Sequence, residues 1–418
     1  MPPMVDAPAG KLLSWWRSGS GRAGFFCLAA CVSLSPVSIA AAQVFLALAS
    51  ALFLRERLRG RAANRAPGAA VWPLLCFILW TAAAVLLACD PRRALGEFKK
   101  FFLYLLIPVV PALAAAPGAR VWTYRAVFGA ACLSAVAGLV QFAADPRRDA
   151  LHRISGFLSH WMTFSGTLML AFVGLVAYLL CYGWRRSRWA APLALVLAAA
   201  LFLSQTRSAL LLGIPAGLVA VLWLTRHFKA VGALALLLAA AYLLSPAAIQ
   251  QRLAGALDVN HPDTRNRIEL FGTGARLVRD HPWFGVGPKN VAVEALRYRG
   301  SRDYPDWMYQ HMHNNLLQIA AERGIPGMLL WLWWMLRLLW DAWSGHRRAR
   351  SLEQGEDALE ARMASLAAVG GWCAMLAAGL FEYNFGDSEV LILFLFMMSA
   401  PYADASSRRA DTTRGAPS

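Results

Sequence analysis

Long apolar runs separated by short clusters of charged residues dominate this sequence. The runs are rich in Ala and Leu, and most are close to the roughly 20 residues that cross a bilayer as an α-helix. A soluble α/β protein would instead show runs of about 4–8 residues broken by Gly and Asn turns. With 58% hydrophobic and 16% charged residues, the chain has too few polar residues to cover a water-soluble domain of 418 residues. We therefore predict an all-α polytopic membrane protein.

About twelve transmembrane helices are predicted from the apolar runs. Nine would lie in residues 1–245 and three in residues 325–401, followed by a disordered cytoplasmic tail at 402–418. The N-terminus resembles a secretory signal, but its apolar run resumes at once, so we expect an uncleaved helix pair bent at Pro36. The predicted helices span residues 23–35, 37–54, 70–88, 98–116, 121–143, 157–182, 189–204, 208–224, 228–245, 325–343, 363–384 and 387–401.

The distribution of Lys and Arg predicts the orientation. Twelve helices place both termini on one side, and if that side is cytoplasmic, its segments hold 22 of the 41 basic residues. We therefore expect cytoplasmic termini. The seven cysteines show no CxxC or Cys/His ligand spacing, so neither disulfides nor zinc are expected.

Eight basic residues fall in short external loops, where positive charge works against membrane insertion. Acidic neighbours such as Asp90, Glu97, Asp145 and Asp149 offer one explanation, simple neutralisation. An anionic ligand on the external face is the other. The eight residues are Arg92, Arg93, Lys99, Lys100, Arg147, Arg148, Arg153 and Arg207.

One external loop, residues 246–324, is far longer than the others and is expected to fold as a small helical cap that carries the functional motifs. Asp263 or Thr264 can cap a helix that ends at His281-Pro282. The sequence contains no internal repeat, which gives a transporter with inverted repeats no support. The apolar face of the loop helix is predicted to consist of Ile268, Phe271, Ala275 and Val278.

The loop closes with His-Met-His-Asn-Asn at 311–315, and Asn314 or Asn315 can cap a helix that Gly324 and Pro326 stop. Histidines two residues apart in an extended segment point opposite ways, so a shared metal site is not expected. A histidine at the start of a helix can face a cleft as a general base. A solvent-facing or capping histidine is the alternative.

Three arginines are candidates for anion binding. Arg207 lies in a tight turn with no acidic residue within fifteen positions, so it either snorkels to the interface or needs a distant partner or a ligand. Arg265 and Arg267 flank Asn266 at a helix start, where cations oppose the helix dipole. They would either hold an anion with the free backbone N–H groups or pair with Asp263 and Glu269.

The order of these motifs resembles the bacterial O-antigen ligase and polymerase superfamily, and looks most like the O-antigen ligases. The resemblance covers residues from about 90 to 390. It is carried by Thr-Arg-Ser at 206–208, Arg-Asn-Arg at 265–267, His-Pro-Trp-Phe-Gly-Val-Gly-Pro at 281–288, His-Met-His-Asn-Asn-Leu at 311–316 and Gly-Ile-Pro-Gly at 324–327.

This resemblance implies a glycosyltransferase of the GT-C type in the bacterial inner membrane, with its active site facing the periplasm. Such an enzyme would transfer O-antigen polysaccharide from undecaprenyl diphosphate to a lipid A-core oligosaccharide, with inversion and without metal, nucleotide sugar, ATP or other cofactor. Nucleic acid would not be a partner. A sister O-antigen polymerase and a protein O-oligosaccharyltransferase share the same motifs, and a transporter of lipid-linked sugar is a less favoured alternative.

The resemblance also implies roles for single residues. Arg207 and Arg265 match the arginines that bind the donor diphosphate, with Arg267 beside them, and His313 matches the histidine near the acceptor hydroxyl. Further contacts to the acceptor or to anionic substrate groups are expected from Arg92, Arg93, Lys99, Lys100, Arg147, Arg148, His311 and Asn314.

Overall fold

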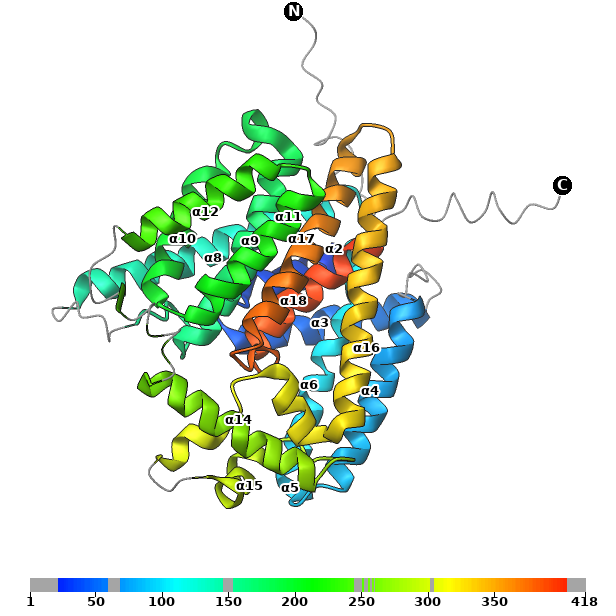
Figure 1. The fold of residues 1–418 in the computed structure, drawn as a ribbon. Helices are drawn as coiled ribbons and strands as arrows, with labels where there is room; N and C mark the ends of the chain where they lie inside the picture. Colours follow the sequence, from blue (N-terminus) through cyan, green and yellow to red (C-terminus); the bar gives the residue numbers. More distant parts are fainter. Residues whose placement is uncertain are drawn as a thin grey trace, which may run out of the picture.

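The protein is a bundle of α-helices with a smaller group of helices at one end (Figure 1). The computed structural model describes residues 22–58, 68–145, 153–243, 250–251, 255, 258, 260–300 and 304–403. No strand occurs among these residues, in agreement with the predicted all-α class. The bundle consists of α2 (Arg22–Leu34), α3 (Ile39–Leu58), α4 (Gly68–Leu86), α8 (Ala119–Ala144), α9 (Trp161–Ser187), α10 (Ala190–Ser204), α11 (Ile214–Leu224), α12 (Phe228–Leu243), α16 (Asn315–Ser351), α17 (Glu356–Ala378) and α18 (Ser388–Ser399).

A helical segment is found at each predicted membrane-helix position. Within the described residues, five helices are long and apolar enough to cross a bilayer: Ile39–Leu58, Ala69–Leu86, Ala119–Ala144, Trp161–Ser187 and Glu356–Ala378. Four more apolar helices are shorter: Arg22–Leu34, Ala190–Ser204, Ser208–Leu224 and Ser388–Ala403. The chain is thus a helical membrane protein, while the total of twelve membrane helices stays a prediction. The turn between α2 and α3 includes Pro36, where the bend was expected.

The predicted continuous helix at 98–116 is wrong in detail. This part of the chain consists of short pieces: α5 (Pro91–Ala94), η1 (Leu95–Glu97), α6 (Phe98–Phe101), η2 (Leu103–Leu105) and α7 (Leu106–Leu113). Proline removes a backbone donor and its ring clashes with the carbonyl four residues earlier. For Pro108 that carbonyl belongs to Tyr104, which lies in η2, and α7 contains a second proline, Pro111. Pro108 therefore contributes to the interruption of the α-helix at η2. The apolar pattern alone does not indicate this interruption.

The core of the bundle surrounds α17 and α18. Helix α17 packs against α9, α11, α16 and α18. Every residue of α18 from Val390 to Ser399 is buried. The described residues around this apolar helix therefore enclose it on all sides. Buried aromatic rings of Trp334 and Phe385 pack beside it, with centroids 6.2 Å apart. Such a core gives the adjoining loop at 379–387 a rigid base.

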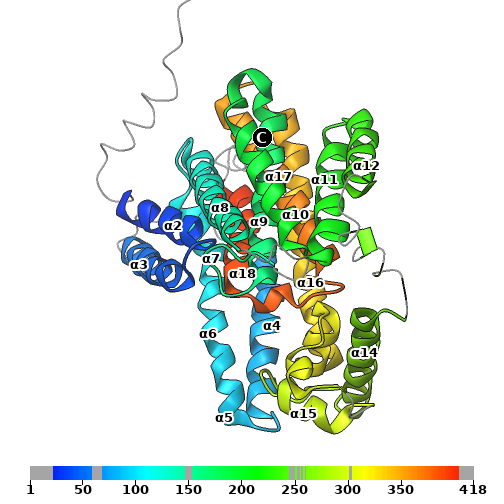
Figure 2. The same cartoon turned by 90° about the vertical axis from the view of Figure 1, so that its left-hand side faces the viewer.

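Beyond one end of the bundle, the long loop folds into α14 (Pro262–Asp280), α15 (Val291–Tyr298) and the 3-10 helix η4 (Asp306–Gln310). Figures 1 and 2 show α14 and α15 at the same end of the molecule as α5, where α4, α6 and α16 extend beyond the rest of the bundle. This group has its own apolar core, separate from that of the bundle. The core consists of Leu270, Leu277, Val286, Val291, Ala295, Met308, Tyr309, Met312 and Ala321.

Two details of the loop helix differ from the sequence prediction. Because α14 begins at Pro262, Asp263 and Thr264 lie within it and do not cap it. Its buried face contains Leu270 and Leu277, whereas the predicted face residue Ile268 is 55% exposed. The helix does end before His281, as expected.

Helix α16 carries the polypeptide from this group of helices back into the bundle. Asn314 caps it, its side chain accepting a hydrogen bond from the N–H of Leu317 (2.8 Å), as the sequence predicted. Helical geometry is interrupted at Gly324 (φ 71°, ψ 175°), two residues before Pro326. The predicted stop is therefore a kink, which separates the first nine residues of α16 from the rest of the helix.

Candidate active site

A cavity of about 470 Å³ lies where the start of α9 and the turn after α10 face α14 and η4. Residues from four separate parts of the sequence meet there. Its lining combines cationic, imidazole, aromatic and uncharged polar side chains, and among the residues that the structure describes no carboxylate lines it. The lining residues are Arg153, His160, Trp161, Met162, Gln205, Thr206, Arg207, Ser208, Asn266, Arg267, Leu270, Trp307, Met308, Gln310, His311 and His313.

The turn between α10 and η3 (Ser208–Gly213) directs Arg207 into the cavity. Helix α10 ends at Gln205, whose backbone is left-handed (φ 51°), so the chain reverses before the next apolar helix. Arg207 is only 8% exposed. The adjacent Ser208 hydroxyl donates a hydrogen bond to Oε2 of buried Glu382 (2.6 Å), which ties the turn to the 379–387 loop. Arg207 therefore reaches the cavity from a fixed backbone rather than lying along the interface.

The Glu382 carboxyl lies outside the α17 and α18 helices. Burial raises the pKa of Glu382 to about 8, although the hydrogen bond from Ser208 opposes this shift. A carboxyl with this raised pKa therefore lies beside the Arg207 turn. Glu382 was not predicted as a site residue, because it falls within an apolar run that was interpreted as a membrane helix.

Only one arginine of the Arg-Asn-Arg motif lines the cavity. Arg267 does so, and its guanidinium lies 5.5 Å from the ring centroid of Phe381. Arg265 is exposed, and its Nη2 donates to Oδ1 of Asn260 at 3.3 Å. Residues two apart on an α-helix point about 200° away from one another, so the two side chains cannot share a cavity. The structure thus separates two residues that the sequence placed together.

His311 and His313 both line the cavity, with ring centroids 4.2 Å apart in an edge-to-face arrangement. The prediction that they point in opposite directions is wrong. It assumed an extended segment, but His313 has a left-handed backbone (φ 46°), which turns its side chain back toward His311. The Nδ1 atoms of both rings are buried and have no hydrogen-bond partner among the described residues.

The electrostatic environment keeps both imidazoles neutral. Burial is the main cause that lowers the pKa of His313 to about 3, and the charges of His311, Arg267 and His160 act in the same direction. Burial also lowers the pKa of His311. At neutral pH each ring therefore has a free nitrogen lone pair that can accept a proton.

The two asparagines after the histidines have structural contacts. Asn314 caps α16 and its Nδ2 donates to the carbonyl of Leu380 (2.9 Å). The Asn315 amide nitrogen donates to the carbonyl of Gly379 (2.7 Å), and its side chain bonds to Asn384. Asn314 is absent from the cavity lining, and its contacts fix the histidine segment against the 379–387 loop.

Four other basic residues expected to contact substrate are described by the structure, and none of them lines the cavity. Arg92, Arg93 and Lys99 are exposed on α5 and α6, and Arg93 Nε lies 3.8 Å from Asp90. Lys100 is buried, 3.6 Å from Glu97. Arg147 and Arg148 lie outside the described residues.

Several cavity residues were missed by the sequence prediction of the site. Arg153 was recognised only as an external charge, and its guanidinium lies 4.9 Å from the ring centroid of Trp161. His160 caps α9 by accepting from the N–H of Met162 (3.2 Å), and burial lowers its pKa. Its position just before an apolar run was the available signal. Trp307, 70% exposed, gave no signal, because nothing in the sequence placed η4 against α9.

The Gly-Val-Gly segment at 285–287 has a packing role. The N–H groups of Val286 and Gly287 donate to the carbonyls of Ala321 (2.9 Å) and Glu322 (3.1 Å) on α16. A Cβ on Gly285, whose φ is +65°, would lie 2.4 Å from the Ala321 carbonyl oxygen. The segment thus joins α14 and α15 to the first turns of α16, and it stands away from the cavity lining.

Among the described residues, no group of three or more His, Cys, Asp or Glu side chains is arranged to hold a metal ion. The guanidinium groups that line the cavity can bind an anion, and a neutral imidazole there can accept a proton.

Residues 192–332 match the family described as O-Antigen ligase. This match includes Arg207, Arg267, His311 and His313, and it confirms the resemblance to the O-antigen ligase and polymerase superfamily. No curated protein matches the chain.

Proposed function

Because residues 192–332 match the O-antigen ligase family, we propose that this protein is an O-antigen ligase of the GT-C type. It transfers a polysaccharide from undecaprenyl diphosphate to a lipid A-core oligosaccharide during lipopolysaccharide synthesis. The protein lies in the bacterial inner membrane with cytoplasmic termini, and the cavity faces the periplasm.

The observation that carries this proposal is the meeting of Arg207, Arg267 and His313 in one cavity. Glycosyl transfer from a lipid diphosphate needs a stabilised leaving group and an acceptor hydroxyl that can lose its proton. The three side chains supply these two needs. Arginine is suited to the first, because its planar fork donates two parallel hydrogen bonds to phosphate oxygens.

In the proposed reaction, an acceptor hydroxyl oxygen forms a bond to the anomeric carbon of the donor sugar. The bond between that carbon and the diphosphate oxygen breaks, and its electron pair leaves with undecaprenyl diphosphate. The hydroxyl proton passes to a ring nitrogen of His313. Direct displacement inverts the anomeric configuration. Arg207 and Arg267 stabilise the negative charge that grows on the leaving diphosphate, and this scheme requires no metal.

A deletion strain tests the proposal against the sister reactions. Loss of the whole lipopolysaccharide ladder, with polymer left on the lipid carrier, is expected for a ligase. A band with a single repeat would indicate a polymerase, and a normal ladder would contradict both. Complementation with His313→Ala should fail to restore the ladder. Arg265→Ala should restore it, since that side chain lies outside the cavity.

A further inference from the structure

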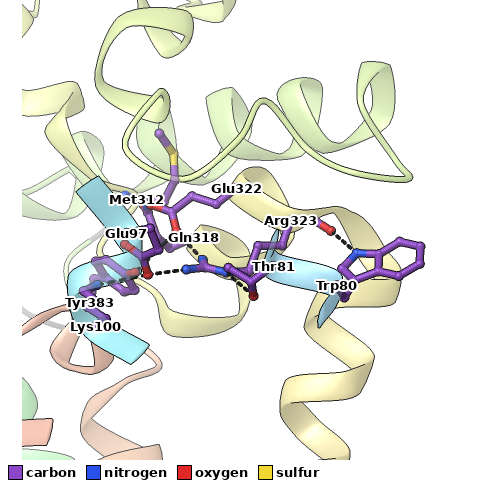
Figure 3. Close-up of polar contacts among 9 residues, drawn as sticks. All are labelled: Trp80, Thr81, Glu97, Lys100, Met312, Gln318, Glu322, Arg323 and Tyr383. Carbon is purple, nitrogen blue, oxygen red and sulfur yellow. Dashed lines mark hydrogen bonds and ion pairs between the residues drawn. The ribbon is translucent and has the colours of Figure 1, made fainter. Parts of the chain in front are cut away.

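A buried polar network lies between the first turns of α16 and the segment that joins α4 to α7 (Figure 3). Its charged members are Glu97, Lys100, Glu322 and Arg323, so two carboxylates balance two cations. Arg323 is 1% exposed and its guanidinium contacts both Glu322 and Glu97. Buried charges of this kind are stable only when each is paired. The network is thus a rigid, charge-balanced connection between distant parts of the chain.

Gln318 connects this network to the histidine segment. Its Nε2 donates to Oε1 of Glu322 at 2.9 Å, while its Oε1 accepts from the backbone N–H of Met312 at 2.8 Å (Figure 3). Since Glu322 presents only acceptors when ionised, it fixes which end of the Gln318 amide faces Met312. Met312 lies between the two histidines that line the cavity.

A second connection runs through Tyr383. Its hydroxyl donates to Oε2 of Glu322 at 3.5 Å, and Lys100 Nζ lies 5.4 Å from its ring centroid. The Tyr383 ring is in turn 6.3 Å, between centroids, from the ring of His311. The Glu322 carboxylate is therefore connected to the histidine segment in two ways. Gln318 links it to the backbone of Met312, and Tyr383 links it to the ring of His311.

We propose that Gln318 and Glu322 are positioning residues for the histidine segment at 311–313, a proposal that rests on the proposed function. The left-handed backbone of His313 costs free energy for a residue with a Cβ, so it persists only when its surroundings hold it. The hydrogen bond from the Met312 N–H to Gln318 fixes the backbone at the residue just before His313. Without it, the segment can relax and the His313 ring shifts away from the acceptor hydroxyl.

Glu322→Gln and Gln318→Met test this role, with Glu360→Gln as the matched control. Glu360 is also a buried carboxylate paired with an arginine, Arg120, at 3.2 Å. It lies 18 residues before the end of α17, a helical distance of about 27 Å from the 379–387 loop. The measurement is the rate of transfer by purified protein in detergent, with lipid-linked polysaccharide as donor and lipid A-core as acceptor.

The two network variants should lose about 10- to 100-fold in kcat, with the donor KM within about two-fold of wild type, because the arginines still hold the diphosphate. Their pH profiles should also change, since a relaxed His313 becomes more solvated and titrates at higher pH. Glu360→Gln should keep wild-type kcat and pH profile. Thermal unfolding in the same detergent shows which variants are folded, and Gln318→Met keeps the test open if Glu322→Gln does not fold.

Wild-type kcat in folded Gln318→Met would overturn the positioning role, and so would a raised donor KM with unchanged kcat. An equal loss of kcat in Glu360→Gln would show that general destabilisation is the cause, and would also overturn it. A wild-type protein that transfers no polysaccharide overturns the proposed function as well. If the wild-type protein and both network variants transfer polysaccharide at the same rate, only the positioning role is overturned.

Discussion

The two arginines of the Arg-Asn-Arg motif give the sharpest test of the site, because one lines the cavity and the other does not. We expect Arg267→Ala to lose most transferase activity and Arg265→Ala to keep it. The two residues share a helix, a charge and nearly the same place in the sequence. A variant pair of this kind holds net charge and local sequence constant, so a difference between the two must come from where the side chains point.

The expected size of the effect follows from the contact that is lost. A charge-assisted hydrogen bond to a leaving group in a partly dehydrated cavity contributes about 2–4 kcal/mol in the transition state. By transition-state arithmetic, this is a loss of roughly 30- to 1,000-fold in kcat/KM for Arg267→Ala. Arg267→Lys should recover little of it, since the bidentate fork is lost. For exposed Arg265, substitution should change the rate by no more than about two-fold.

The assay is transfer by purified protein in detergent, with single-turnover rates to separate chemistry from product release. Arg207→Ala serves as the positive comparison, because Arg207 lines the same cavity from the opposite segment. A severe loss in Arg265→Ala beside a mild one in Arg267→Ala would refute this assignment of the diphosphate site. Equal severe losses would show that the anion contacts both arginines, in a geometry other than the one described.

The pKa of His313 is lowered to about 3 by burial and neighbouring positive charge, so the neutral base persists when pH falls through about 6.5, the ordinary value for histidine. We expect kcat/KM at pH 5.5 to stay near its value at pH 7.5, and an acid limb at about 6.5 would contradict the burial of the ring. His313→Ala should lose about 100-fold or more in transfer while still binding donor, and a more severe His311→Ala would identify the other histidine as the base. EDTA should leave purified activity unchanged, and loss that a divalent ion restores would reveal a metal site. A reporter fused after Arg185 should be cytoplasmic and one fused within 255–300 periplasmic, whereas both on one side would contradict the predicted topology.

The helices were largely predictable from sequence, because their signal is local. An apolar run about 20 residues long predicts a helix wherever it occurs, and the described helices lie at the predicted positions. Caps are equally local, as Asn314 at the start of α16 illustrates. The exception is the segment at 98–116, where hydropathy predicted one helix and the structure has short helical pieces, to which the proline at 108 contributes.

The composition of the site was predictable in part, but its geometry was not. The predicted topology placed these arginines and the histidine on one face of the membrane. It could not separate Arg265 from Arg267, because that requires the rotation of α14, which depends on packing Leu270 and Leu277 into a core with distant residues. It also could not place the histidines, because the positive φ of His313 has no reliable sequence signal in a residue other than glycine.

Close backbone contacts at Gly285 and Gly324 hold the segment after α14 against the first turns of α16. Gly324, at the kink of α16, has no room for a side chain: a Cβ there would lie 1.9 Å from the carbonyl oxygen of Trp283. A Cβ on Gly285 would lie 2.4 Å from the carbonyl oxygen of Ala321. The backbone leading from α14 is thus in direct contact with the backbone that follows the histidines. Helix α14 carries Arg267 and α16 begins just after His313, so this contact joins the two elements that bring these side chains to the cavity. The Gly-Val-Gly segment therefore contributes through packing, and its residues are absent from the cavity lining.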